Sequence, residues 1–121
     1  MKVNSILTVA DSMEQKFADT FRYKVVELSD DVESDIQKHF RECIQFLEEE
    51  FTADRTVYVH CAAGVSRSAS VVISYFMWKN KMTLVEAVAA VKEKRPCIKP
   101  NNGFMIQLAN FENELRAEGH L

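Results

Sequence analysis

In the middle of the chain a strand-like run, a short loop and an apolar helix follow one another without a break. The run from Thr56 to His60 (TVYVH) is rich in β-branched and aromatic residues, which favours a strand and makes it a candidate for the centre of a sheet. Residues 61–67 form a loop that leads into the helix expected from Ser68 to Lys79. A strand that feeds directly into a helix is typical of α/β folds, in which helices cover a sheet of parallel strands. This junction constrains the fold more than any other part of the chain.

Two strands and one helix are expected before this junction. Val3 to Ala10 is predicted to be a buried strand and Lys24 to Leu28 a shorter one. The polar segment from Asp11 to Tyr23 has no sustained period, so we expect a loop with room for one helical turn. From Ser34 on, apolar residues recur at helical spacing, with Glu48–Glu50 on or near the outer face. The predicted core stripe of this helix consists of Ile36, Phe40, Cys43, Ile44, Leu47 and Phe51.

Two more helices are expected after the junction. Thr83 and Glu86 form a capping-box pattern that opens a helix ending near Lys94. Pro100–Asn102 opens the last helix. Its predicted core stripe and C-terminal cap are Phe104, Leu108, Phe111, Leu115 and Gly119. Strands come first and helices dominate the rest, so we predict an α/β fold with a mostly parallel central sheet flanked by helices.

Length, charge and cysteine content exclude several classes of protein. The 121 residues fit a single domain, which we assign to residues 1–121. With 15 basic and 18 acidic residues the net charge is −3, which argues against a nucleic-acid partner. The apolar run Ala69–Trp78 is too short to cross a bilayer, so we expect no membrane partner, and no signal peptide opens the chain. Three cysteines without metal-ligand spacing indicate free thiols in the cytoplasm or the nucleus.

Cys61 and Arg67 bracket the loop at the junction. A short loop that ends at a helix N-terminus points backbone N–H groups into one concavity, which suits an anion, and Gly64 supplies the backbone freedom for the curve. The planar guanidinium of Arg67 can grip two phosphoryl oxygens at once. The same field lowers the pKa of a thiol to roughly 3.5–7.5. An ionised Cys61 beside a bound phosphate would be a nucleophile for phosphoryl transfer.

Residues 60–68 read HCAAGVSRS, which matches the signature HCxxGxSRS of the dual-specificity phosphatases, within the cysteine-dependent protein tyrosine phosphatase superfamily. Residues 95–108 read RPCIKPNNGFMIQL and resemble the family stretch RPxxxPNxGFxxQL. Residues 73–77 (ISYFM) resemble the helix that follows the family's loop. The resemblance covers essentially the whole chain and implies a protein-tyrosine-phosphatase-like fold.

The resemblance also implies the catalytic roles. Cys61 attacks phosphorus and forms a cysteinyl-phosphate, while Arg67 holds the phosphoryl oxygens. Asp30 falls where the family carries its general-acid loop, whereas its neighbour Asp31 is expected to be a solvated turn residue. Ser68 lies close enough in sequence to hydrogen-bond the sulfur and to stabilise it as the leaving group.

The binding and supporting residues follow from the same resemblance. The phosphate-binding loop (P-loop) that would hold the substrate comprises Ala62, Ala63, Gly64, Val65, Ser66 and Arg67. His60 would orient this loop and tune the thiol, and Asn101 would tie a later loop to it. Lys92, Lys94, Arg95 and Lys99 form either a solvated helix end or a surface that steers substrate. No metal or other cofactor is implied.

The implied function is hydrolysis of phosphotyrosine and phosphoserine or phosphothreonine in proteins. One alternative is a phosphatase of a non-protein substrate, such as an RNA 5′-triphosphate or a phosphoinositide. Such relatives tend to carry basic residues between the cysteine and the arginine, and here residues 62–66 are uncharged. A phosphoprotein-binding module without turnover and a sulfurtransferase are further alternatives.

The start of the chain departs from the family pattern. Family members usually begin with a strand and a helix before the segment that matches Val3–Ala10, and this sequence begins at that segment. We therefore expect an N-terminally short catalytic domain with an open sheet edge, which a homodimer could cover.

Overall fold

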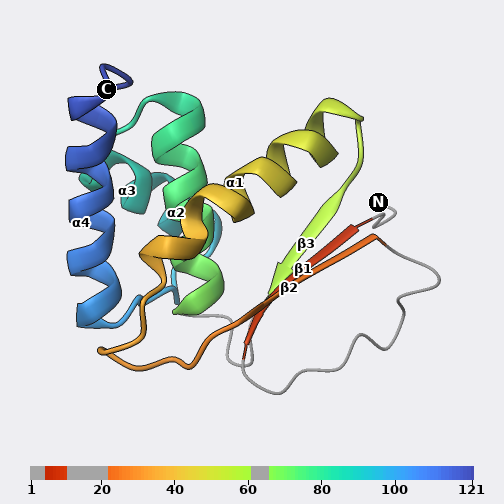
Figure 1. Cartoon of the computed structure of the whole chain (residues 1–121), viewed down its shortest axis with the longest axis horizontal. Helices are drawn as coiled ribbons and strands as arrows, with labels where there is room; N and C mark the ends of the chain where they lie inside the picture. The colour runs from red at the N-terminus through yellow and green to blue at the C-terminus, as the bar shows by residue number, and fades with distance from the viewer. Residues whose placement is uncertain (1–4, 11–21, 61–65) are drawn as a thin grey trace.

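The computed structural model describes residues 5–10, 22–60 and 66–121, which form three strands and four helices (Figure 1). Along the chain the elements are β1 Ser5–Ala10, β2 Arg22–Glu27, α1 Gln37–Thr52, β3 Val57–His60, α2 Arg67–Asn80, α3 Leu84–Lys94 and α4 Asn102–Ala117. The strand and the helix predicted on either side of the central junction are confirmed to within one residue at each end.

The three strands form a parallel sheet in the order β2-β1-β3, which confirms the predicted α/β fold. Two details of the prediction are wrong. The centre of the described sheet is β1, not β3, because β1 is buried on both faces, as the neighbouring residues Ile6 and Leu7 show. Arg22 and Tyr23 begin β2 instead of ending a loop, because the polar side of this strand faces carboxylates of α1.

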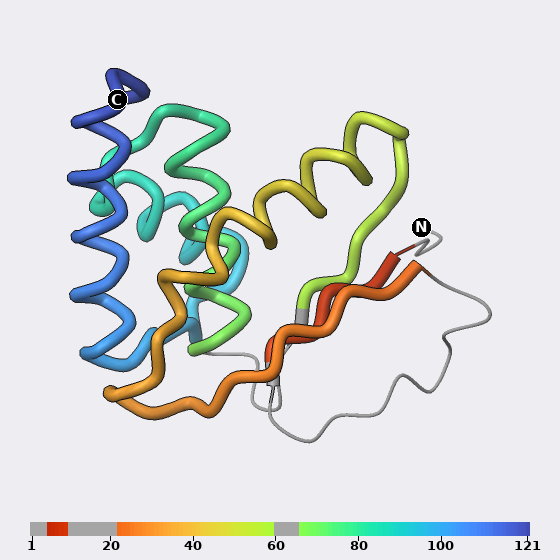
Figure 2. The backbone as a smooth tube through the Cα atoms, in the orientation of Figure 1, coloured from red at the N-terminus to blue at the C-terminus, as the bar shows by residue number. Residues whose placement is uncertain are grey.

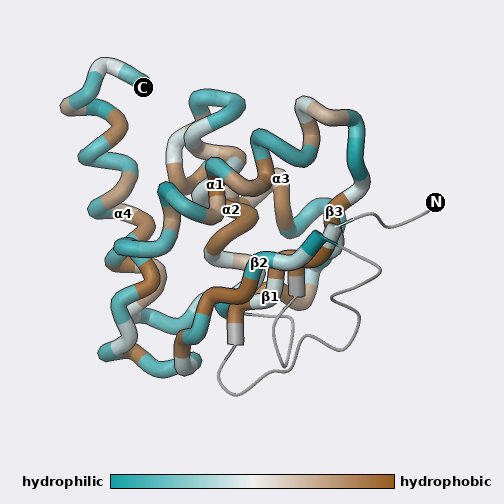
Figure 3. The backbone as a smooth tube through the Cα atoms, turned by 45° about the vertical axis from the view of Figure 1, so that its right-hand side comes forward, coloured by the Kyte–Doolittle hydropathy of each residue, from teal (hydrophilic) through white to brown (hydrophobic). Residues whose placement is uncertain are grey.

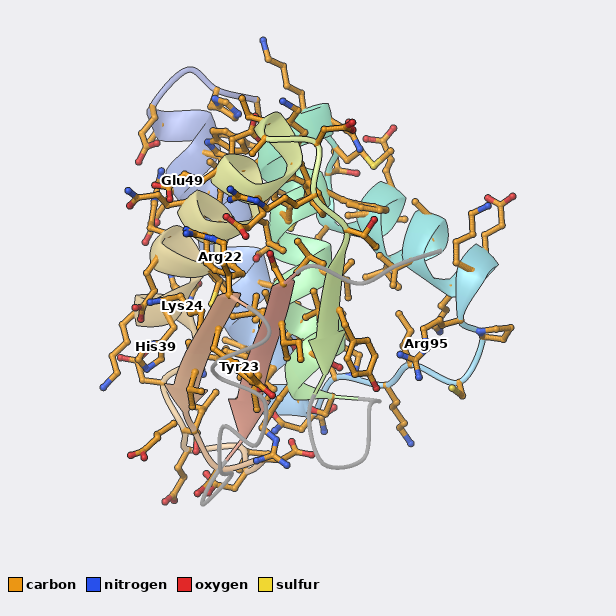
Figure 4. The ribbon with its side chains drawn as sticks, turned by 90° about the vertical axis from the view of Figure 1, so that its right-hand side faces the viewer. Arg22, Tyr23, Lys24, His39, Glu49 and Arg95 are labelled. Atoms are coloured by element: carbon orange, nitrogen blue, oxygen red, sulfur yellow. The ribbon has the colours of Figure 1, made fainter. Side chains whose placement is uncertain are left out.

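All four helices lie on one side of the described sheet (Figures 1 and 4). Side chains alternate along a strand, so one face of β1 carries Ser5, Leu7 and Val9. Leu7 and Val9 belong to the core that the helices share, and Ser5 hydrogen-bonds Glu50 of α1. On β2, Lys24 pairs with Glu42 of α1 at 2.9 Å and lies on the same face (Figure 4). The sheet and the helices therefore form two layers with the core between them.

The core stripe predicted for α1 is correct except at its end. Phe40, Cys43 and Leu47 are buried, but Phe51 is 44% exposed and packs edge-on against Tyr75, with ring centroids 5.6 Å apart. In place of Phe51, Glu50 turns inward and is 0% exposed. The prediction of an outer position for Glu50 is therefore wrong, because basic partners at the start of the sheet neutralise its carboxylate.

The two C-terminal helices begin with the caps that the sequence predicts. Thr83 Oγ1 accepts from the Glu86 backbone N–H at 3.3 Å, and Glu86 Oε1 accepts from the Thr83 backbone N–H at 2.9 Å, which confirms the capping box. Gly119 has a φ of +74° just beyond α4, as expected of a C-terminal cap. Hydrophobic and hydrophilic residues alternate with the turns of α4 (Figure 3), and its predicted stripe of four residues is fully buried. Among the described residues, no helix has the length and apolar character that crossing a membrane requires.

Candidate active site at the carboxyl edge of the sheet

The carboxyl ends of the parallel strands meet at one edge of the sheet, and the predicted P-loop begins and ends there. His60 is the last residue of β3, and Ser66 directly precedes α2. Cys61 and residues 62–65 lie outside the described residues, so their predicted roles stay predictions. The predicted roles of His60 and Ser68 refer to the same loop and stay predictions as well. Because the first N–H groups of a helix carry partial positive charge, the start of α2 favours an anion at this edge.

Arg67 connects the start of α2 to the segment that follows β2. Its side chain is almost entirely buried, and Nη1 donates to the carbonyl oxygen of Leu28 at 2.8 Å. Leu28 and Arg67 are 39 positions apart in the sequence, so only the fold brings them together. The guanidinium that would hold phosphate is thereby fixed beside the segment that carries Asp30.

Asp30, Asn101 and Ser66 form a hydrogen-bonded chain across three segments. The Asn101 side-chain amide donates to Asp30 Oδ1 at 2.9 Å, and the Asn101 backbone N–H donates to Ser66 Oγ at 3.0 Å. The Ser66 carbonyl in turn accepts from the backbone and the hydroxyl of Ser70, at 2.9 and 2.7 Å. The predicted general acid and the predicted supporting asparagine thus lie together, next to the residue that precedes Arg67.

Asp31 has a different environment from Asp30. Its Oδ1 accepts from the Glu33 backbone N–H at 3.0 Å and from the Ser34 hydroxyl at 3.1 Å. These contacts with residues two and three positions ahead are typical of an Asx turn. Asp31 therefore stabilises the bend after β2, as the sequence predicts.

Two residues of the motif at 95–108 hold the segment after β2, which carries Asp30 and is called the acid segment below, against α4. A Cβ atom on Gly103 would lie 2.1 Å from the carbonyl oxygen of Val32, so only glycine permits this approach of two backbones. In Figure 2 the segment that follows β2 passes the start of α4. Gln107 donates to the Ser34 carbonyl at 2.8 Å and accepts from the Gln37 backbone N–H at 2.9 Å. Both residues belong to the motif in the sequence, but their roles cannot be inferred from it, since their partners are about 70 residues away.

An open hollow of about 370 Å³ lies where these segments meet. Its lining includes the Asp30–Asn101–Ser66 chain, with Lys99 supplying a positive charge and Val32 an exposed apolar surface. The predicted basic run divides here: Lys99 faces this hollow, whereas Lys94 and Arg95 line a second cavity of about 130 Å³, which Ser68 at the start of α2 also lines. Of the four basic residues, Lys99 is therefore the one that borders the hollow of Asp30, whereas Lys94 and Arg95 lie on the side of Ser68.

The two described cysteines are unsuited to catalysis at this edge. Burial, with a smaller effect of the nearby Glu42 carboxylate, raises the pKa of the Cys43 thiol to about 12. Cys97 is exposed, but it does not line the hollow. Within the described ranges, no three His, Cys, Asp or Glu side chains are grouped as a metal site would require. The chemistry of the described edge thus comes from a guanidinium, a carboxylate and helix dipoles.

Three comparisons identify the family. Residues 1–114 match the model of the dual specificity phosphatase catalytic domain. The chain is 41% identical to dual specificity protein phosphatase 1 of Arabidopsis thaliana and 43% identical to dual specificity protein phosphatase 19 of Mus musculus. These alignments cover 94% and 92% of this chain but only 58% and 50% of the two relatives, so it spans little more than half of their length.

Among solved structures, the human tyrosine phosphatase-like serine/threonine/tyrosine-interacting protein is similar, with a TM-score of 0.90 and 32% identity. That match covers 94% of this chain and 79% of the human one. The fold, the matched domain and the sequence identities agree: this chain belongs to the dual specificity phosphatase family.

Proposed function

We propose that this chain hydrolyses phosphotyrosine and phosphoserine or phosphothreonine in proteins through a cysteinyl-phosphate intermediate. The observation that carries this proposal is that hydrogen bonds hold the segment of Asp30 against the start of α2, where Arg67 lies, at the edge where β3 ends. Arg67 comes from the start of α2 and Asp30 from the segment after β2, and Asn101 and Leu28 connect the two through hydrogen bonds.

The proposed reaction has two steps. The Cys61 thiolate attacks phosphorus, the bond between phosphorus and the leaving oxygen breaks, and Asp30 donates a proton to that oxygen. Water then attacks the cysteinyl-phosphate and gives a proton to Asp30, while Ser68 stabilises the departing thiolate. In both steps the backbone N–H groups of residues 62–66 and the Arg67 guanidinium stabilise charge on the equatorial oxygens. No metal or other cofactor takes part in this mechanism.

We propose a phosphoprotein as the substrate, and not an RNA 5′-triphosphate or a phosphoinositide, because residues 62–66 carry no charge. A highly charged substrate would gain from additional cations at the loop, and among the residues lining the described hollow Lys99 is the sole basic side chain. These features support a substrate with a single phosphoryl group on a side chain.

A binding module without turnover is the second candidate, because a phosphatase-like protein named for its interactions shares the fold at a TM-score of 0.90. The presence of both Cys61 and Arg67 in this sequence supports catalysis instead. Turnover of para-nitrophenyl phosphate in the presence of a chelator separates the two candidates. We expect wild-type turnover and a loss of more than about 10⁴-fold in Cys61→Ser, with vanadate affinity retained because the N–H groups and Arg67 remain. Substantial turnover by Cys61→Ser would exclude the cysteinyl-phosphate.

We also propose that the chain forms a homodimer through the β3 side of the sheet. In support, β3 is the outer strand of the described sheet, and Tyr58 on it is 52% exposed. Light scattering over a range of protein concentrations tests this proposal. We expect the mass of a dimer at micromolar concentration, and the mass of a monomer throughout would contradict it.

A further inference from the structure

We propose that Asn101 is a positioning residue for the general acid: it fixes which oxygen of Asp30 carries the transferred proton. This inference rests on the proposed function, because it assumes that Asp30 protonates the leaving group. It adds a specific partner and a specific oxygen atom to that role.

The orientation of the Asn101 amide is determined by its two neighbours. Its Oδ1 accepts from the backbone N–H of Phe104 at 2.8 Å, and a backbone N–H can only donate. The opposite orientation would place the amide NH₂ against that N–H and an oxygen against the Asp30 carboxylate. Nδ2 must therefore point to Asp30, as the distance of 2.9 Å to Oδ1 shows.

This contact makes the two oxygens of Asp30 different. Oδ1 accepts a hydrogen bond from Asn101, and a proton on that oxygen would occupy a lone pair and make Oδ1 a weaker acceptor for the amide N–H. The acid form of Asp30 consequently carries its proton on Oδ2. During the first step this proton moves to the leaving oxygen as the phosphorus–oxygen bond breaks, and during the second step Oδ2 accepts a proton from water.

Asn101 also has a fixed place in the fold. It caps α4 through Phe104, and its backbone N–H holds Ser66, which directly precedes Arg67. The close approach of Gly103 to Val32 presses the acid segment onto the same helix end. The start of α4 therefore determines where Asp30 lies relative to the guanidinium that would bind phosphate.

Asn101→Ser tests the proposal, because serine is also a good helix cap but has no amide donor. We expect kcat for a phosphothreonine peptide to fall about 10-fold, while kcat for an activated aryl phosphate changes less than about twofold and KM stays unchanged for both. Asn101→Asp keeps the capping oxygen and replaces the donor with an acceptor. It should likewise lower the ratio of kcat for the peptide to kcat for the aryl phosphate. Thr83→Ala is the matched control: it removes the cap of α3, so it should lower the melting temperature and leave the ratio unchanged.

The double variant Asp30→Asn, Asn101→Ser shows whether Asn101 acts through Asp30. We expect it to have the same ratio of rates as Asp30→Asn alone, because the oxygen that Asn101 would fix no longer carries a proton. Three results would overturn this inference without affecting the assignment of Asp30. Asn101→Ser could reduce both rates equally, or its loss could add to that of Asp30→Asn in the double variant. Asn101→Ser could also keep the wild-type ratio of rates while Asp30→Asn is impaired. Wild-type rates in Asp30→Asn would overturn it together with the assignment of the general acid.

Discussion

The two edges of the sheet both carry a network of polar side chains, but the two networks differ in burial and in charge. At the amino edge, the Glu50 carboxylate of α1 accepts hydrogen bonds from Ser5 at the start of β1 and from Arg22 at the start of β2. Arg55, just before β3, donates to the same carboxylate at 3.1 Å. At the carboxyl edge, Asp30 is exposed and accepts from the amide of Asn101 at 2.9 Å.

The difference in burial and charge distinguishes a structural edge from an exposed one. Glu50 is 0% exposed and lies within hydrogen-bond distance of two cations, so its charge is neutralised inside the protein and holds three elements together. Asp30 borders an open hollow, and its amide partner orients the carboxyl group without neutralising it. The amino edge is therefore a structural junction, whereas the carboxyl edge presents oriented polar groups to an open hollow. In Figure 4, Arg22 of the amino-edge network lies beside α1, whereas Arg95, which belongs to neither network, lies far from α1, across the sheet.

The largest effect that tests this comparison is expected for Asp30→Asn. A general acid typically contributes about 10²–10⁴-fold, and it matters most when the leaving group is poor. We expect turnover of a phosphothreonine peptide to fall within that range and turnover of an activated aryl phosphate to fall much less. Asp31→Asn is the matched control and should change neither rate, since Asp31 only stabilises a turn. A large loss in Asp31→Asn that depends on the leaving group would move the acid by one residue.

Arg67→Lys should have the next largest effect. Lysine carries the same charge, but it cannot grip two oxygens in one plane, and it would have to replace the buried hydrogen bond to Leu28. Loss of one preorganised donor costs about 10²–10³-fold, so kcat should fall by that amount on every substrate. Arg116→Lys on the exposed end of α4 is the control. If Arg67→Lys retains the wild-type rate, the guanidinium does not stabilise the transition state.

Glu50→Gln should have the smallest effect on chemistry but a clear effect on stability. Burial opposes ionisation of Glu50, but the hydrogen bonds from Ser5 and Arg22 outweigh it and hold its pKa below the ordinary value of 4.5. We expect the free energy of unfolding to fall by about 2 kcal/mol at pH 7, a modest figure because Arg22 is 56% exposed. The ratio of rates for poor and good leaving groups should be unchanged.

The pH dependence of unfolding sharpens this prediction. A carboxyl group whose pKa is lowered by folding stabilises the protein above its ordinary pKa and loses this effect as the pH falls through the folded value. The difference between wild type and Glu50→Gln in urea unfolding should therefore be full at neutral pH and should shrink below about pH 4.5. Glu49→Gln, on the exposed side of α1, should unfold like wild type. A difference that grows on acidification would show that Glu50 is not stabilised in its ionised form.

The sequence by itself determined most of the elements and the family. Local signals sufficed for the capping box at Thr83, the stripe on α4 and the strand that ends at His60, because period and capping depend on neighbours in the chain. The motif at residues 60–68 likewise identified the family before any contact was known.

Only the tertiary structure decided which residues meet. Glu50 falls among exposed glutamates in the sequence, yet it is buried because the starts of three strands bring Ser5, Arg22 and Arg55 around it. The same holds for the pairing of Asp30 with Asn101, 71 positions apart. Charge neutralisation and hydrogen bonding act over a few ångströms in space, and the separation of two residues along the chain does not indicate whether they lie that close.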